Sequence, residues 1–207
     1  MLSTVTASTP SLPAHDNPTV VRLFEAAADA FADKGFHATT TRDIASRAGL
    51  SPAGVYVHFA SKEDLLFQLS RVGHEGARDA LAEAAAQAES PTDALAEVIS
   101  AFARWHAEEY QVARIVQYEF RHLSTEHQRE VLTLRREIDA VVEQIITEGV
   151  ATGEFSVEDI RATALAALSL VVDVARWYHP GVRRTTPTQI ADTYGTLALR
   201  LVGARST

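Results

Sequence analysis

The sequence contains no cysteine, one methionine and two tryptophans among its 207 residues. The lack of cysteine excludes disulfides, thiolate zinc sites, cysteine nucleophiles and cysteine-ligated clusters. No apolar run approaches the roughly 18 residues that a membrane-spanning helix requires. Residues 1–16 lack the basic residues and the apolar stretch of a secretory signal. We therefore expect a cytoplasmic protein with no membrane partner.

Charge is unevenly distributed along the chain. Residues 1–62 contain five basic and five acidic side chains, so the net charge of −8 lies in the remaining residues. Within residues 39–62 there are three basic side chains and one acidic side chain. A protein that binds a polyanion concentrates positive charge at the contact. The sign of the charge therefore suits nucleic acid near the N-terminus and nowhere else.

Helix start and stop residues divide the chain into successive helices. Asn17 and Pro18 form a typical helix start, and Gly35 stands where a C-terminal glycine belongs. Residues 1–16 are rich in Ser, Thr and Pro, which predicts a disordered tail. No stretch has the alternation of a β-strand, so we predict an all-α fold. The predicted helices begin near residues 18, 41, 52 and 62 and then span 92–108, 110–122, 126–151, 157–178 and 188–203.

The spacing of small and apolar residues predicts a helix-turn-helix unit over about 40–59. Ala45 is small where the two helices cross, Gly49 accepts a positive φ in the turn, and Val55 is apolar where the second helix faces the first. The alternative is a helical hairpin that binds no DNA. Two features favour DNA binding: the second helix is too short to be stable alone, and its outward residues are small enough to enter a major groove.

Residues 39–65, TTTRDIASRAGLSPAGVYVHFASKEDL, resemble the signature of the TetR family of bacterial transcriptional regulators. The resemblance extends over about residues 18–78. It implies a DNA-binding domain at 17–77 and a larger C-terminal helical domain at 78–207 that binds a ligand and dimerises. The DNA-binding residues that we expect are Thr41, Arg42, Ser51, Pro52, Ala53, Gly54, Tyr56, His58 and Lys62.

The family resemblance also assigns roles to these positions. Thr41 and Arg42 match residues that contact DNA at the start of the second helix, and the matches of Tyr56, His58 and Lys62 hold phosphates. Pro52, Ala53 and Gly54 match positions that face base edges. Relatives place larger polar groups where this chain has Ala53 and Gly54. The small side chains favour methyl contact or shape readout over hydrogen bonds to bases.

A two-fold dimer is expected because dimers of such proteins span two half-sites of a palindromic operator. Residues 164–178 are apolar around the helix, and residues 188–203 carry one apolar face. The family pairs its last two helices in a four-helix interface, although the same pattern also suits an ordinary core. The interface residues that we expect are Leu168, Val171, Ala175, Tyr194, Leu197 and Leu201.

Aromatic residues gather in the predicted helices between 92 and 151, where the family encloses a small-molecule pocket. Such pockets are mostly apolar with a few polar groups. An ordinary helical core also contains aromatic residues, and either arginine could instead be ion-paired. The pocket residues that we expect are Phe102, Trp105, Tyr118, Arg121, His122 and Arg176.

Motifs for catalysis and for metal binding are absent from the sequence. Glu119 and His122 have the spacing of a helical di-iron site, but such a site needs this motif on two helices. We therefore expect no enzyme activity, no metal and no cofactor. The predicted function is a homodimeric, ligand-responsive repressor of operator DNA. Its effector would be small and hydrophobic or amphipathic. The C-terminal segments ARWYHPG and IADTYGTLALRLVG loosely resemble regulators of fatty-acid and steroid breakdown, which respond to acyl-CoA thioesters, and this resemblance suggests an acyl-CoA.

Two other functions remain open. The first is a DNA-binding dimer without a small-molecule effector, whose second domain serves dimerisation alone. The second is a helical enzyme or binding module whose helix-turn-helix is not functional.

Overall fold

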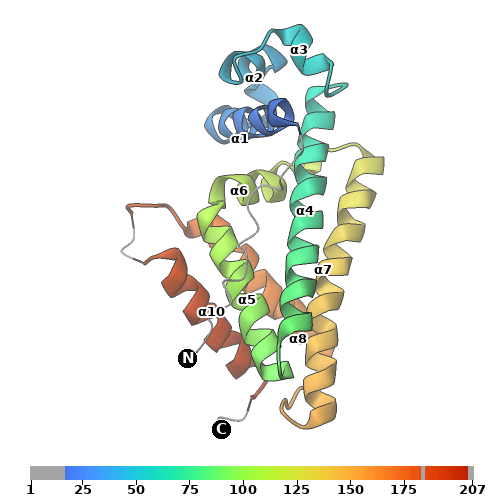
Figure 1. Cartoon of the computed structure of the whole chain (residues 1–207), viewed down its shortest axis with the longest axis vertical. Helices are drawn as coiled ribbons and strands as arrows, with labels where there is room; N and C mark the ends of the chain where they lie inside the picture. Colours follow the sequence, from blue (N-terminus) through green and yellow to red (C-terminus); the bar gives the residue numbers. More distant parts are fainter. Residues whose placement is uncertain (1–16, 183–184, 205–207) are drawn as a thin grey trace. The chain divides into compact units, whose positions relative to one another are not determined.

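The computed structural model describes residues 17–182 and 185–204, which form helices joined by short loops and no β-strand (Figure 1). The all-α prediction is confirmed for this part of the chain. The expected disordered tail at 1–16 lies outside the described residues. No described helix combines the length and apolar character that crossing a bilayer requires.

Packing divides the described residues into two compact units. The N-terminal unit contains residues 17–75 and 111–134. The C-terminal unit contains residues 76–110 and 135–204, apart from residues 183 and 184. The sequence suggested a division near residue 77 but did not indicate that a later segment packs with the N-terminal residues.

The N-terminal unit begins with α1 (Pro18–Ala38), which is capped by the Asn17 side chain accepting from the Thr19 N–H at 2.9 Å. The helix was expected to end at Gly35. Gly35 does leave the helical conformation, with φ of 74°, but the helical turn resumes after this kink and reaches Ala38. The glycine is needed there because its positive φ is strained for other residues.

Short helices α2 (Thr41–Arg47) and α3 (Pro52–Tyr56) follow, and α4 (Lys62–Gln87) begins after them. A capping box begins α2, with Thr40 and Asp43 bonding each other's backbone N–H. The second helix of the predicted pair ends at Tyr56, earlier than the expected Phe59. Figure 1 shows α1, α2 and α3 grouped at the beginning of α4.

Residues 111–134 also pack into the hydrophobic core of the N-terminal unit. It comprises most of α6 (Tyr110–Tyr118), the 3-10 turn η1 (Phe120–His122) and the start of α7 (Thr125–Thr152). The sequence had predicted one continuous helix over 110–122. Side chains of this segment join one hydrophobic cluster with those of α1 to α4, which includes Leu23, Ile44, Val55, Leu65, Ile115, Val116, Leu123 and Val131.

The C-terminal unit is built on α5 (Pro91–Glu108), the rest of α7, α8 (Ile160–Val172), α9 (Val174–Trp177) and α10 (Pro187–Leu201). The predicted helix 157–178 starts only after the Asp159 cap and is interrupted at Asp173. Helices α5 and α10 lie side by side (Figure 1). They approach closely because Gly195 has no side chain: a Cβ there would lie 2.3 Å from Ser100 Oγ.

Candidate nucleic-acid interface

The core of the helix-turn-helix forms as the spacing predicts. Ala45 and Val55 are 0% and 1% exposed, and Gly49 adopts a φ of 67° in the turn between α2 and α3. The Leu50 N–H donates to the Ala45 carbonyl at 2.8 Å, which closes this turn. Burial of Val55 fixes the rotation of α3, so the opposite face of that short helix must point to solvent.

The solvent face of α3 carries Ala53, Tyr56 and the capping residue Val57. Tyr56 is 56% exposed and Val57 is 78% exposed. The Tyr56 hydroxyl lies 3.4 Å from Thr41 Oγ1, which connects the end of α3 with the start of α2. At the other end, Ser51 Oγ accepts the Gly54 N–H at 3.1 Å and caps the helix.

Arg42 is an exposed cation next in sequence to Thr41, whose Oγ1 meets the Tyr56 hydroxyl. It lies in the first turn of α2 and makes no ion pair with any described residue. A fully charged, uncommitted guanidinium suits a phosphate or the edge of a guanine. His58 is only half exposed and lies beside Phe59, with 6.5 Å between the ring centroids.

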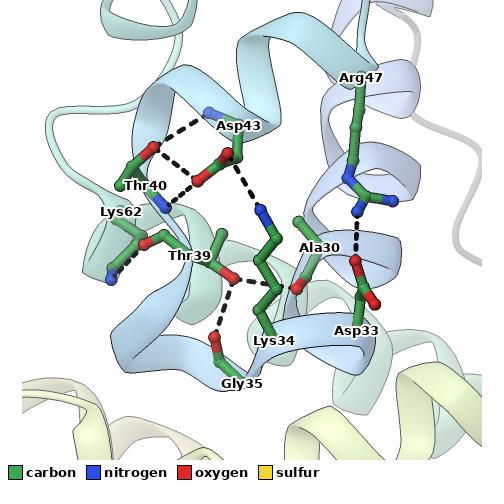
Figure 2. A network of polar contacts seen from close by, with 9 residues as sticks. All are labelled: Ala30, Asp33, Lys34, Gly35, Thr39, Thr40, Asp43, Arg47 and Lys62. Carbon is green, nitrogen blue, oxygen red and sulfur yellow. Dashed lines mark hydrogen bonds and ion pairs between the residues drawn. The ribbon is translucent and has the colours of Figure 1, made fainter.

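The other two cations around α2 are paired with carboxylates (Figure 2). Lys34 lies 3.3 Å from Asp43, and Arg47 lies 2.6 Å from Asp33. Hydrogen bonds from the Thr40 hydroxyl and N–H, followed by the Lys34 ammonium, lower the pKa of Asp43 to about 2. These pairs neutralise two acidic groups that would otherwise repel a polyanion.

Lys62 makes contacts within the protein that the sequence did not indicate. Its Nζ donates to the carbonyls of Phe36 and Thr39 at 2.5 and 2.7 Å and lies 4.2 Å from the centre of the Phe36 ring. Burial lowers the pKa of Lys62, and the nearby Glu119 carboxylate opposes this shift. The ammonium caps the C-terminal end of α1, and its expected contact with a DNA phosphate stays a prediction.

Sequence reasoning missed a polar junction between α1 and the α6–η1 segment. Glu119 accepts the Phe36 N–H at 3.4 Å and lies 3.2 Å from His122 Nε2. The His122 ring stacks on Phe36 with centroids 5.2 Å apart and meets His37 edge-on at 4.1 Å. The only signal in the sequence was the Glu119–His122 spacing, which we had weighed as part of a metal site; no cluster of three metal-ligating side chains occurs among the described residues.

A second junction links α4 with the start of α7 in the same unit. Glu63 accepts from the Ser124 N–H at 2.8 Å and lies 2.8 Å from His127 Nδ1. The His127 ring stacks on Phe67 with 3.7 Å between centroids. The α6–α7 segment is therefore held against α1 by the contacts of Glu119 and His122 with Phe36, and against α4 by Glu63 and His127.

The six expected ligand residues are divided between the two units, three in each. Phe102 and Trp105 are buried on α5, with nearly parallel rings 6.4 Å apart and His106 edge-on to both. The indole N–H of Trp105 has no hydrogen-bond partner within the part of the chain that the structure describes.

The other four expected ligand residues have different surroundings. Tyr118, Arg121 and His122 belong to the N-terminal unit, and Tyr118 is 50% exposed. Arg176 is exposed and makes a two-pronged ion pair with Asp173 at 2.6 and 2.7 Å, which corresponds to the ion-paired alternative.

Three of the expected dimer residues are unsuited to an interface. Leu168, Val171 and Ala175 are at most 4% exposed, because they fill the core of their own unit. Tyr194 is half buried, and burial raises its pKa. Helices α8 and α10 pack against each other and leave four leucines open to solvent, Leu165, Leu170, Leu197 and Leu201.

Comparison with known proteins gives matches in both parts of the chain. Residues 23–69 match the family profile of bacterial regulatory proteins of the tetR family, and residues 88–202 match that of a tetracyclin repressor-like C-terminal domain. The chain is 33% identical over 177 residues to the HTH-type transcriptional repressor KstR2 of Mycolicibacterium smegmatis, with 84% of each protein covered. It is 26% identical over 137 residues to the fatty acid metabolism regulator protein of Bacillus subtilis, with 66% of this chain and 71% of the relative covered.

Solved structures agree with these matches. A TetR-family regulatory protein from Rhodococcus RHA1 has a TM-score of 0.85 at 39% identity over 92% of this chain and 100% of its own. FadR from Bacillus subtilis with stearoyl-CoA has the same fold, with a TM-score of 0.74 at 21% identity over 90% and 99% of the two chains. AibR with isovaleryl coenzyme A and operator DNA has a TM-score of 0.79 at 21% identity over 90% and 100%. The curated relatives are named as regulators and not as enzymes, and the chain belongs to the TetR family of bacterial transcriptional regulators, as the signature at 39–65 predicted.

Proposed function

We propose that this regulator is a cytoplasmic homodimeric repressor that binds a palindromic operator through α2 and α3 and is released by a small amphipathic effector. The observation that carries the proposal is the solvent face of the helix-turn-helix. Val55 is buried while Tyr56, Val57 and the unpaired Arg42 face outward together. This is the arrangement by which a short helix enters a major groove beside phosphate contacts.

The domain organisation follows from the same assignment. The N-terminal unit would bind DNA, and the C-terminal unit would bind the effector and the second protomer. Segment 111–134 belongs to the N-terminal unit by packing but continues into α7, most of which belongs to the C-terminal unit. We therefore expect a change in the C-terminal unit to reach the helix-turn-helix through α4 and α7, since both helices contain residues of each unit.

An acyl-CoA thioester is the effector class that we favour. Support comes from the CoA thioesters bound to FadR and AibR and from the fatty acid regulator among the relatives. In this chain, the buried Phe102–Trp105–His106 cluster offers apolar surface together with one indole N–H that lacks an acceptor. A buried donor without a partner is costly, and a carbonyl of a bound ligand would relieve that cost.

The effector must bind one conformation of the dimer better than the other to release DNA. A hundredfold preference corresponds to about 2.7 kcal/mol of coupling free energy. A ligand with equal affinity for both forms would leave operator binding unchanged, however tightly it bound.

The test combines site selection with titration. Purified full-length protein would be used to select duplexes from a random library, and the enriched operator would be titrated in gel shifts with palmitoyl-CoA, with free coenzyme A as the matched control. We expect palmitoyl-CoA to weaken operator binding and coenzyme A to have no effect. Equal operator affinity with and without the thioester would refute the acyl-CoA proposal, and failure to enrich any duplex would refute operator binding.

A further inference from the structure

The solvent face of α3 is apolar, which is unusual for a surface that meets DNA. Ala53, Tyr56 and Val57 lie three and four positions apart and so share one face of the helical turn. Between them they offer one polar side-chain atom, the Tyr56 hydroxyl, which is directed at Thr41 Oγ1. Val57 is 78% exposed, the same value as Val182, and these two are the most exposed large apolar side chains of the described residues.

The groups around this face decide what can cover it. Arg42, next to Thr41 in the first turn of α2, has no carboxylate partner among the described residues, and the aspartates at 33 and 43 are neutralised by Arg47 and Lys34. An apolar protein surface would leave the Arg42 charge unpaired, whereas a DNA groove supplies phosphates for it. In the major groove, the C5-methyl of thymine is the apolar group that a base edge presents.

We propose that Val57, together with Ala53, is a specificity-determining residue that recognises thymine by contact with its C5-methyl group. Each half-site then contains A·T pairs whose thymine methyls face α3. Arg42 and Thr41 set the position of the helix on the backbone. This inference rests on the proposed operator binding and adds to it the chemical feature of the operator that is read.

The alternative for a helix with small side chains is shape readout, in which the protein senses groove width or flexibility and touches no methyl. The two differ in one measurable respect. Deoxyuridine pairs as thymidine does but lacks the methyl, so replacing thymidine by deoxyuridine removes the contact and leaves the base pair. Methyl readout is sensitive to this exchange at particular positions, whereas shape readout is not.

The experiment uses the full-length protein and the operator obtained by site selection. Each conserved thymidine is replaced singly, and then symmetrically in both half-sites, by deoxyuridine, and the Kd is measured at one fixed salt concentration. We expect about a fourfold loss at the contacted position, since that factor is the equivalent of about 0.8 kcal/mol for one buried methyl-sized group. The symmetric replacement should weaken binding by about sixteenfold if the half-sites contribute equally.

Protein variants test whether Val57 is the residue that contacts the thymine methyl group. Val57→Ala should fold with an unchanged Tm because the side chain is exposed, and it should reduce the thymidine-to-deoxyuridine ratio at one position to about one. Leu132→Ala is the matched control, because Leu132 is 43% exposed in the same unit but lies on α7. It should keep the full ratio.

Three results would overturn the proposal or a part of it. Equal binding of thymidine and deoxyuridine operators would overturn methyl readout while leaving operator binding intact. A ratio that persists at every thymidine in Val57→Ala would overturn the assignment to this residue, since the effect would then come from Ala53 or from the DNA itself. If no duplex is enriched by the wild-type protein, both the inference and the proposed function fail.

Discussion

Lys62 shows how the same side chain can be assigned two roles at the residue scale. Its position in the family signature suggested a phosphate contact, yet its ammonium donates to two backbone carbonyls at the end of α1. Partners 26 and 23 residues away in sequence could not be found from the local pattern. The Lys62 ammonium therefore contributes to the stability of the fold, because the last carbonyls of a helix lack partners within the helix.

We predict that Lys62→Met destabilises the protein by about 1–2 kcal/mol, since two hydrogen bonds to carbonyls are lost while the aliphatic stem is retained. Urea denaturation followed by circular dichroism would measure the change in the free energy of unfolding. Arg42→Met is the control, because its guanidinium has no partner among the described residues. It should keep the wild-type stability and lose operator affinity. Unchanged stability of Lys62→Met would mean that the two bonds contribute nothing.

At the element scale, the caps are where sequence and structure agree best. Helices α1, α2 and α3 begin near residues 18, 41 and 52 as predicted, because their caps Asn17, Thr40 and Ser51 each bond a backbone N–H only two or three residues away. Helix ends were predicted less well. The end of α3, the break at Asp173 and the turn η1 depend on tertiary contacts that no local pattern contains.

A glycine inside α7 illustrates such a contact. A Cβ on Gly149 would lie 2.1 Å from Cδ2 of Phe155, whose ring is 5% exposed. We expect Gly149→Ala to cost about 1–3 kcal/mol through this overlap, even though alanine favours helix. Gly73, inside α4, has no atom within 4 Å of its ideal Cβ position, so Gly73→Ala should instead stabilise by about 0.5–1 kcal/mol. Thermal denaturation of both variants checks the opposite signs, and equal Tm values would contradict the argument.

The junction between α1 and α6–η1 should make stability depend on pH. Burial, then the charges of His37, Arg121 and Lys62, lower the pKa of His122, and Glu119 opposes them. Above the ordinary histidine pKa of about 6.5 the ring is neutral in both the folded and unfolded states. Below it the unfolded chain binds a proton that the folded chain resists, so this contribution to stability is lost as the pH falls.

His122→Phe keeps an aromatic ring on Phe36 and removes the titration. We predict that the free energy of unfolding of the wild type decreases between pH 7.5 and pH 5.5 more steeply than that of the variant. Urea titrations at four pH values on both proteins would show this. Parallel pH profiles would mean that His122 does not carry the dependence. The Phe36 N–H donates to Glu119, so its rate of hydrogen exchange reports independently on the same junction.

At the scale of the whole molecule, the sequence identified both functional regions but not their division by packing. The signature at 39–65 was sufficient for the helix-turn-helix, since that unit depends on offsets within one short window. The placement of residues 111–134 with the N-terminal helices arises from contacts across more than 60 positions, such as Glu63 with Ser124 and Phe36 with Glu119. Sequence order alone assigned this segment to the ligand-binding part.

The same limitation affected the expected dimer face. Helix α8 is apolar on all sides, so its sequence could not distinguish the side buried against its own unit from the side open to a partner. The structure places Leu168 and Val171 inside and leaves Leu165 and Leu170 outside, next to the α10 helix with exposed Leu197. An apolar surface of this kind suits the second protomer of the homodimer that we propose.

We predict that the double variant Leu165→Glu, Leu197→Glu sediments as a monomer, because two carboxylates would have to be desolvated against each other across the two-fold interface. The monomer should still bind a single half-site weakly, but its affinity for the full operator should fall by about a hundredfold or more, since linkage of two binding units is lost. Leu132→Glu places the same charge on an exposed leucine of α7 and should remain dimeric at the same concentration. A double variant that remains a dimer in sedimentation velocity would locate the interface elsewhere. A monomer with undiminished operator affinity would instead mean that one helix-turn-helix supplies all of the binding energy, without the linkage of two binding units on which the proposed dimer depends.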